Sequence, residues 1–168
     1  MAFNRKEKLR DNIEAIRTVF TLEKQQRAAT PEEREILGRF CGFGGLKCIL
    51  NPAASLMDAA QWTKSDRELF PLTAELHRLI RDNSKDEREY KRYFDSLKSS
   101  VLTAFYTPPE VVAALADTLH DNGITPHRLL DPSAGQGVFI SAFGAHAPGA
   151  EVMAFDKDLL TGKLLSYL

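Results

Sequence analysis

The chain has 168 residues, of which 43% are hydrophobic, and its formal net charge is −1. This length can bury one sizeable core and predicts about one domain. No segment approaches the roughly 18 consecutive apolar residues that a membrane-spanning helix needs, and the N-terminal residues lack the apolar centre of a signal peptide. We therefore expect a cytoplasmic protein without a membrane partner.

The charges are unevenly distributed. Residues 1–98 hold 19 of the 22 basic and 16 of the 23 acidic side chains, a balance of +3, which leaves −4 on residues 99–168. If the protein binds DNA, the N-terminal part is the favoured side, although helices of mixed charge usually face water. Cys41 and Cys48 lack the paired spacing of a zinc site, and no metal is expected.

Residues 1–98 are predicted to form a helical region. Apolar residues recur at helical spacing from residue 4 to 27, and Thr30-Pro31-Glu32-Glu33 is a capping box that begins a second helix running towards Phe40. Ser65-Asp66-Arg67-Glu68 is a second capping box, before a helix that ends near Asn83. A further helix is predicted over residues 86–98, and an irregular stretch over 99–106.

Two segments between these helices allow a functional or a structural interpretation. The glycines of Gly42-Phe43-Gly44-Gly45 either let a backbone approach a ligand or form a helix end and turn, with Phe43 in the core. The chemistry of the residues favours the turn. Asn51-Pro52-Ala53-Ala54 is interpreted as a loop, and Trp62 as a core contact rather than a residue that stacks on a base.

Residues 99–168 contain a predicted strand-turn-helix unit. The apolar residues before Asp131 indicate a short buried strand (128–131), Gly135 and Gly137 allow a tight turn, and an apolar helix follows over 137–146. A second strand is expected over 151–155 and another helix from Leu159. Two parallel strands joined by a helix form the first unit of a doubly wound sheet.

The turn favours one kind of nucleotide cofactor. Asp156 lies 19 positions after Gly137, where a ribose-binding carboxylate is expected. A dinucleotide fingerprint requires a third glycine where this chain has Ile140, so an oxidoreductase is the weaker hypothesis. Asp131 suits a cofactor that carries ammonium and sulfonium charges, as S-adenosylmethionine does.

The segment Asp131-Pro132-Ser133-Ala134-Gly135-Gln136-Gly137, preceded by Phe105-Tyr106-Thr107-Pro108-Pro109-Glu110, resembles the two S-adenosylmethionine motifs of N6-adenine DNA methyltransferases. The resemblance is closest to the methylase-helicase proteins of phages and conjugative elements, where a segment similar to Arg39-Phe40-Cys41-Gly42-Phe43-Gly44-Gly45-Leu46 lies upstream. It implies an α/β protein in which a helical region is followed by the first β-α-β unit of a Rossmann-like fold, helical overall with a small parallel sheet. Residues 99–168 would then be a partial S-adenosylmethionine-binding subdomain.

The resemblance also implies roles for individual residues. Thr107 would contact the carboxylate end of the cofactor, with Tyr106 and Pro108 shaping the pocket, while Thr107-Pro108-Pro109-Glu110 caps the helix that follows. Asp131 would lie near the methionine amino group, and Asp156 would bind the ribose. The cofactor-binding residues expected beside them are Ser133, Ala134, Gly135, Gly137 and Lys157.

The chain lacks the Asn/Asp-Pro-Pro-Tyr/Phe tetrapeptide that holds a flipped adenine in this family. It therefore resembles the N-terminal part of a DNA methyltransferase that acts in restriction-modification or on mobile elements, with DNA as the partner of the intact protein. The chain alone is expected to be inactive and to self-associate through an unpaired sheet edge, unless the N-terminal helices cover that edge. The alternative is a degenerate methyltransferase that binds DNA or protein without catalysis.

Overall fold

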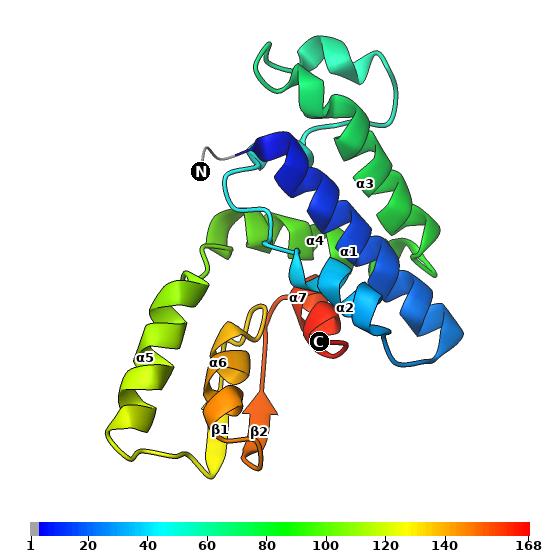
Figure 1. The fold of residues 1–168 in the computed structure, drawn as a ribbon. Helices are drawn as coiled ribbons and strands as arrows, with labels where there is room; N and C mark the ends of the chain where they lie inside the picture. The colour runs from blue at the N-terminus through cyan, green and yellow to red at the C-terminus, as the bar shows by residue number, and fades with distance from the viewer. Residues whose placement is uncertain (1–3) are drawn as a thin grey trace.

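The computed structural model describes residues 4–168 (Figure 1). Within these residues a small parallel sheet lies beside a larger helical body, which agrees with the predicted α/β class in which helix dominates. The elements are, in chain order, α1 (Arg5–Gln25), α2 (Pro31–Gly38), η1 (Lys47–Leu50), η2 (Asp58–Gln61), η3 (Arg67–Leu69), α3 (Phe70–Asp82), α4 (Glu87–Thr103), α5 (Pro109–Asp121), β1 (Arg128–Asp131), α6 (Val138–His146), β2 (Glu151–Ala154) and α7 (Leu159–Leu165).

The main core lies in the helical body, between α1, α3, α4 and α7. The buried positions of α1 follow the predicted helical spacing, and they include Leu9, Ile13, Ile16 and Phe20. Burial of large aliphatic and aromatic side chains contributes roughly 1.5–3 kcal/mol for each side chain. The helical body therefore contains most of the buried hydrophobic core among the described residues.

The C-terminal helix α7 belongs to this core, although it follows the sheet in sequence. Leu160 and Leu164 are buried among the side chains of the helical body, and Lys163 forms an ion pair with Glu23 of α1. The predicted irregular stretch from residue 99 is wrong over its first part, because α4 continues to Thr103. The predicted boundary at residue 98 therefore falls inside a helix.

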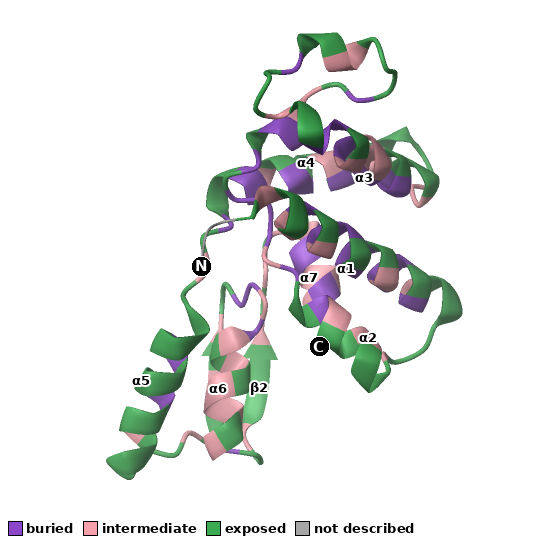
Figure 2. Cartoon of the chain, turned by 45° about the horizontal axis from the view of Figure 1, so that its top comes forward, coloured by how far each residue is buried: buried purple, intermediate pink, exposed green. Residues whose placement is uncertain are grey.

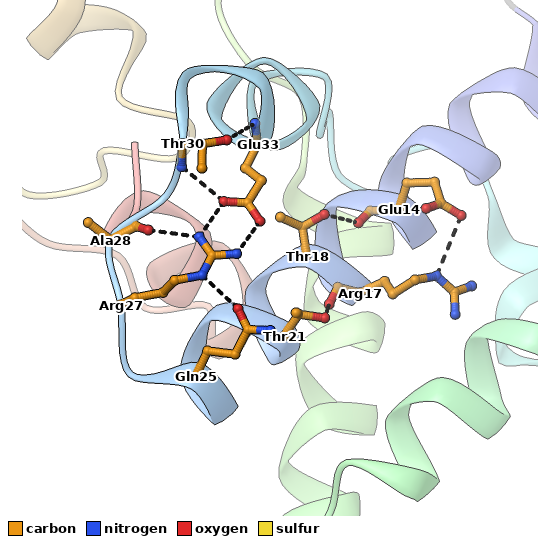
Figure 3. Close-up of polar contacts among 9 residues, drawn as sticks. All are labelled: Glu14, Arg17, Thr18, Thr21, Gln25, Arg27, Ala28, Thr30 and Glu33. Carbon is orange, nitrogen blue, oxygen red and sulfur yellow. Dashed lines mark hydrogen bonds and ion pairs between the residues drawn. The ribbon is translucent and has the colours of Figure 1, made fainter.

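The predicted capping box at the start of α2 is confirmed (Figure 3). The Thr30 side chain accepts a hydrogen bond from the Glu33 backbone N–H at 3.3 Å, and the Glu33 carboxylate accepts one from the Thr30 backbone N–H at 2.9 Å. The same carboxylate receives two hydrogen bonds of 2.6 Å from the Arg27 guanidinium. Arg27 thus fastens the loop before α2 to its first turn.

The other two predicted capping boxes do not form. Ser65 caps no helix, because a turn of 3-10 helix precedes α3 and Asp66 bonds Arg5 and Thr63 instead. At α5 the capping position is occupied by Pro108 rather than by Thr107, and no side chain accepts a hydrogen bond there. Two successive prolines fix an extended entry and move the start of the helix forward by one residue.

Among the described residues the sheet has two strands, which agrees with the predicted β-α-β unit. β1 and β2 are parallel, with Leu129 opposite Val152 and Leu130 opposite Met153. The helix between them, α6, packs on α5, and the two run side by side beyond the helical body (Figure 1). The chain thus forms one β-α-β unit with an additional helix before it.

This unit is much less buried than the helical body (Figure 2). Leu130 is 67% exposed and Met153 is 53% exposed, so the N-terminal helices do not cover the sheet as one alternative predicted. On α5 only part of the apolar surface is covered, because Val112 is buried whereas Val111 and Leu115 are exposed. No helix among the described residues is long and apolar enough to cross a membrane.

The interpretations of two loop residues in the helical body are settled by packing. Phe43 is buried in the core, as the turn interpretation requires. Trp62 is also buried: its ring contacts Phe70 edge to face, and its indole N–H donates to the Pro52 carbonyl at 2.9 Å. Trp62 is therefore a core contact and not a surface for stacking a base.

Candidate functional site

A cavity of about 430 Å³ lies where the helical body meets the β-α-β unit. Its walls come from the last turns of α4, the segment leading to α5, the glycine turn after β1 and the residues between β2 and α7. These segments are far apart in sequence and meet because α7 packs into the helical body. Seven of the predicted site residues line the cavity: Tyr106, Thr107, Ser133, Ala134, Gly135, Asp156 and Lys157.

Asp156 joins two walls of the cavity. One of its carboxylate oxygens accepts a hydrogen bond from the Gly135 backbone N–H at 2.9 Å, and the other accepts one from the Asp158 backbone N–H at 2.7 Å. A carboxylate offers about four acceptor positions, so two remain for a ligand. Asp156 therefore fixes the glycine turn and keeps acceptors of its own beside the cavity.

Asp158 connects this turn to the helical body. Its carboxylate caps α7 by accepting from the Thr161 backbone N–H at 2.8 Å, and it also accepts from the Ser96 hydroxyl of α4 at 2.7 Å. The Ser96 oxygen in turn accepts from the Leu160 backbone N–H at 3.1 Å. This chain of hydrogen bonds holds the end of β2 at a fixed position relative to α4.

The glycine turn approaches Tyr106 so closely that a side chain would not fit. A Cβ atom at Gly135 would lie 2.9 Å from the ring of Tyr106, and the backbone there has a φ of +53°. Burial raises the pKa of the Tyr106 hydroxyl and outweighs the opposing effect of its hydrogen bond with Thr161, while the charges of Asp156 and Asp158 raise the pKa further. Tyr106 is therefore a neutral phenol packed against the turn.

The glycine segment of the helical body also comes close to Tyr106, at its hydroxyl. A Cβ at Gly42 would lie 2.4 Å from the Ala104 methyl and 3.2 Å from the Tyr106 hydroxyl oxygen. The buried Asn12 side chain accepts from the Cys41 backbone N–H at 2.9 Å and donates to the Gly42 carbonyl at 2.7 Å. The segment is thus a structural turn that packs against the cavity-lining residues Ala104 and Tyr106 without lining the cavity itself.

Three predicted site residues do not line this cavity. Asp131 lies at the end of β1, where its carboxylate accepts from the Ser133 backbone N–H at 3.1 Å and where it borders a separate apolar hollow of about 320 Å³. Pro108 is exposed at the start of α5. Gly137 is buried just before α6. Its φ of +73° is part of the turn, but the residue does not line the cavity.

Sequence reasoning missed the contributions of α4 and α7 to the cavity. Ser99, Ser100 and Thr103 line it from the last turns of α4, and Thr161 lines it from α7. Their hydroxyl groups give this wall a polar character. The clustering of serine and threonine between residues 96 and 103 is the only signal in the sequence, and it identifies no ligand by itself.

The cavity suits a ligand that is polar at several points and apolar along one side. Val138 and Phe139 supply apolar surface, while the carboxylates of Asp156 and Asp158 favour cationic and hydroxyl groups. The amide nitrogen of Gln136, which also lines the cavity, is buried and has no hydrogen-bond partner among residues 4–168. A buried donor without a partner is a place where a ligand acceptor stabilises the protein.

Comparison with known proteins relates part of the chain to methyltransferases. A stretch of 62 residues is 39% identical to the Type II methyltransferase M.XamI of Xanthomonas campestris pv. amaranthicola. The match covers 37% of this chain and 12% of that relative, so the chain matches only a small part of the relative's length. No family model and no solved structure matches the chain. The similarity supports a methyltransferase relationship for the matched stretch.

Proposed function

We propose that the chain is the S-adenosylmethionine-binding portion of a DNA adenine-N6 methyltransferase. The observation that carries this proposal is the convergence of the Tyr106-Thr107 segment, the glycine turn and Asp156 on one cavity. These segments lie apart in the sequence, and the sequence motifs alone predict that they bind one cofactor. The similarity to a Type II methyltransferase supports the same reaction class.

The cavity residues fit the chemical groups of this cofactor. Asp156 retains acceptors for the ribose hydroxyls, Thr107 lines the same cavity, and the buried amide of Gln136, which has no partner among the described residues, provides a donor. Phe139 gives an apolar surface for the adenine ring. When bound, the cofactor supplies an electrophilic methyl group on a sulfonium, and the protein residues named here orient it and exclude water.

DNA is the proposed partner of the whole methyltransferase. The excess of basic over acidic side chains in residues 1–98 supports DNA contact through the helical region. The chain contributes no recognisable adenine-binding tetrapeptide. Its part in the reaction is therefore to bind and present the cofactor.

Titration calorimetry with S-adenosylmethionine tests the proposal. We expect the wild-type chain to bind, and Asp156→Ala to weaken binding at least tenfold, because the variant loses the ribose acceptors and frees the glycine turn. Asp121→Ala, which removes an exposed carboxylate at the end of α5, is the matched control and should bind like wild type. Circular dichroism at the titration temperature shows whether each variant is folded.

Two results would contradict the proposal. The first is the absence of any heat of binding with folded wild-type protein at millimolar cofactor. The second is equal affinity of wild type and Asp156→Ala, which would remove Asp156 from the site. If no cofactor binds, the alternative remains, in which the chain is a degenerate methyltransferase that binds DNA or protein without catalysis. A filter-binding assay with duplex DNA tests the DNA-binding form of this alternative.

A further inference from the structure

A second cavity, of about 610 Å³, lies on the helical body and shares no residue with the cavity described above. It is a groove between the segment of residues 50–56, helix α3 and the first half of α4, whereas the last turns of α4 line the other cavity. We term it the aromatic groove, because rings from α3 and α4 form much of its wall. The proposed cofactor site makes no use of it.

The aromatic groove is positively charged, and none of the described residues that line it is acidic. Burial lowers the pKa of His77, so this imidazole is neutral near pH 7 and the charge comes from Arg78 and Arg81. Arg78 is exposed and has no hydrogen-bond or ion-pair partner among residues 4–168. Its guanidinium is therefore available to an anionic group, and phosphate suits its forked geometry.

The rings beside these arginines form a surface for a planar group. Tyr90 and Phe94 lie one turn apart on α4, with ring centroids 6.2 Å apart. The Arg81 guanidinium lies over the Tyr90 ring, 3.4 Å from its centroid, and it also forms an ion pair with Glu87. The Arg81 side chain is still 51% exposed, which leaves part of it open to a ligand. Nucleobases stack on aromatic rings and on guanidinium groups.

The rim of the groove suits an occupant that continues beyond it. Leu56 lines the groove and is 87% exposed, and its neighbour Met57 is 84% exposed. A free mononucleotide in the groove would leave these apolar side chains in water, whereas the next base of a strand would cover them. In a duplex the bases are paired and stacked on one another, so only an unpaired segment presents its bases to this wall.

We infer that the aromatic groove binds an unpaired segment of DNA, with a base against Tyr90 and Arg81, a phosphate at Arg78 and the next base against Leu56. The choice of DNA rests on the proposed function, in which DNA is the partner of the whole methyltransferase. The strand is held by residues other than those that would hold the cofactor. The groove thus gives the excess of positive charge in residues 1–98 a defined place of contact.

Binding of a labelled, thymine-only single strand, followed by fluorescence anisotropy, tests this inference. Its duplex with an adenine-only strand and thymidine monophosphate are the comparison ligands, the latter measured by competition. Wild type should bind the single strand about tenfold or more tightly than either, because the duplex conceals its bases and the mononucleotide does not reach Leu56. Thymine also avoids competition for the proposed adenine position in the other cavity.

Two variants address the two kinds of contact. Arg78→Gln should weaken binding of the single strand about tenfold, because it removes a charged phosphate contact. Tyr90→Leu, which keeps an apolar side chain but removes the ring, should weaken it by about the same factor. Arg92→Gln is the matched control, since it removes the same charge from an exposed position of α4 outside the groove, and it should bind like wild type. Circular dichroism shows whether each variant is folded.

Trp62 reports where the strand binds. It is the single tryptophan of the chain, its ring contacts Phe70, and its indole N–H donates to the Pro52 carbonyl. Phe70 and Pro52 both line the groove, so an occupant should change the Trp62 emission with the same midpoint as the anisotropy. Binding without that change, equal affinity for single strand and duplex, or equal losses in Arg78→Gln and Arg92→Gln would each overturn the inference.

Titration of the same proteins with S-adenosylmethionine separates this inference from the proposed function. Arg78→Gln should keep the wild-type affinity for the cofactor, because the groove and the cavity share no residue. If wild type binds the cofactor but not the single strand, only the inference about the groove fails. If wild type binds the strand through Arg78 but binds no cofactor, the proposed function fails and the DNA contact at the groove stands.

Discussion

At the scale of single residues, the cavity depends on positions where a backbone comes too close for a side chain. Gly42 of the helical body approaches the Tyr106 hydroxyl, and Gly135 of the turn after β1 approaches the Tyr106 ring. Tyr106 is thus positioned by close backbone contacts as well as by its side-chain hydrogen bond with Thr161. The packing explains why small residues occur in two motifs that are 93 positions apart.

Gly42→Ala should destabilise the protein by about 2–4 kcal/mol, because the new methyl group overlaps Ala104 and the backbone φ of +66° is strained for alanine. Urea unfolding followed by circular dichroism measures this change. Gly38→Ala is the matched control, since nothing lies within 4 Å of its Cβ and it stands at the end of a helix. That variant should be neutral or stabilised by up to about 1 kcal/mol. Equal stabilities of the two variants would show that the approach to Ala104 is not tight.

The two acidic residues of the cofactor motifs show what the sequence can and cannot specify. Asp131 ends β1 and Asp156 follows the end of β2 by two residues, and the sequence alone assigns both to the cofactor. The structure places Asp156 in the cavity wall, whereas Asp131 bonds the turn beside it. Strand ends can be predicted from apolar runs, but the side of the turn to which each carboxylate is directed depends on where α7 packs.

At the scale of elements, only one of three capping-box patterns forms a cap. At Thr30 both reciprocal hydrogen bonds form, and Arg27 bonds the same Glu33 carboxylate without displacing them. At the second site Arg5, 61 residues away, takes the carboxylate of Asp66. At the third, Pro109 displaces the helix start. A local pattern predicts the helix well, but a long-range partner or a second proline changes how it begins.

The cap at Thr30 should make stability depend on pH through Glu33. Hydrogen bonds from Arg27 lower the pKa of Glu33 from its ordinary 4.5 to about 2. The stabilisation from ionised Glu33 is therefore complete above pH 4.5 and is lost as the pH falls through about 2. The difference in urea midpoint between wild type and Glu33→Gln should be constant from pH 7 to 5 and should shrink between pH 4.5 and 2. Glu35→Gln, on the same helix, is the control, and a Glu33→Gln difference that persists at pH 2 would contradict the linkage.

At the scale of the whole molecule, the helical body and the β-α-β unit are joined through α7. The sequence predicted both parts and the parallel strands, since each depends on local periodicity. It did not predict that Leu160 and Leu164 would bury themselves among the N-terminal helices. This packing closes the cavity, and it depends on contacts across more than a hundred residues that no local pattern encodes.

We expect no methyl transfer to DNA by the 168-residue chain alone. Nothing in the sequence provides the tetrapeptide that holds and stacks an extruded adenine, so cofactor binding and chemistry are separable here. Incubation with labelled S-adenosylmethionine and adenine-containing duplex DNA measures this directly. Label incorporated above a control without protein would show that an adenine site exists elsewhere in the chain.

Self-association is expected from the exposed face of the small sheet. β1 and β2 pair only with each other among the described residues, and Leu130, Met153 and Phe155 are 67%, 53% and 55% exposed. Unpaired strand edges beside apolar side chains favour association between chains.

Light scattering over a concentration series should therefore show a rising average mass for wild type. Leu130→Lys should reduce this rise, because a charge on the strand opposes pairing and burial, whereas Leu56→Lys should not, since Leu56 lies on a distant loop and is already 87% exposed. A wild-type mass that stays at 18.8 kDa at every concentration would contradict the prediction, because the protein would then remain a monomer despite the exposed sheet. An equal effect of the two lysine variants would place the contact outside the sheet.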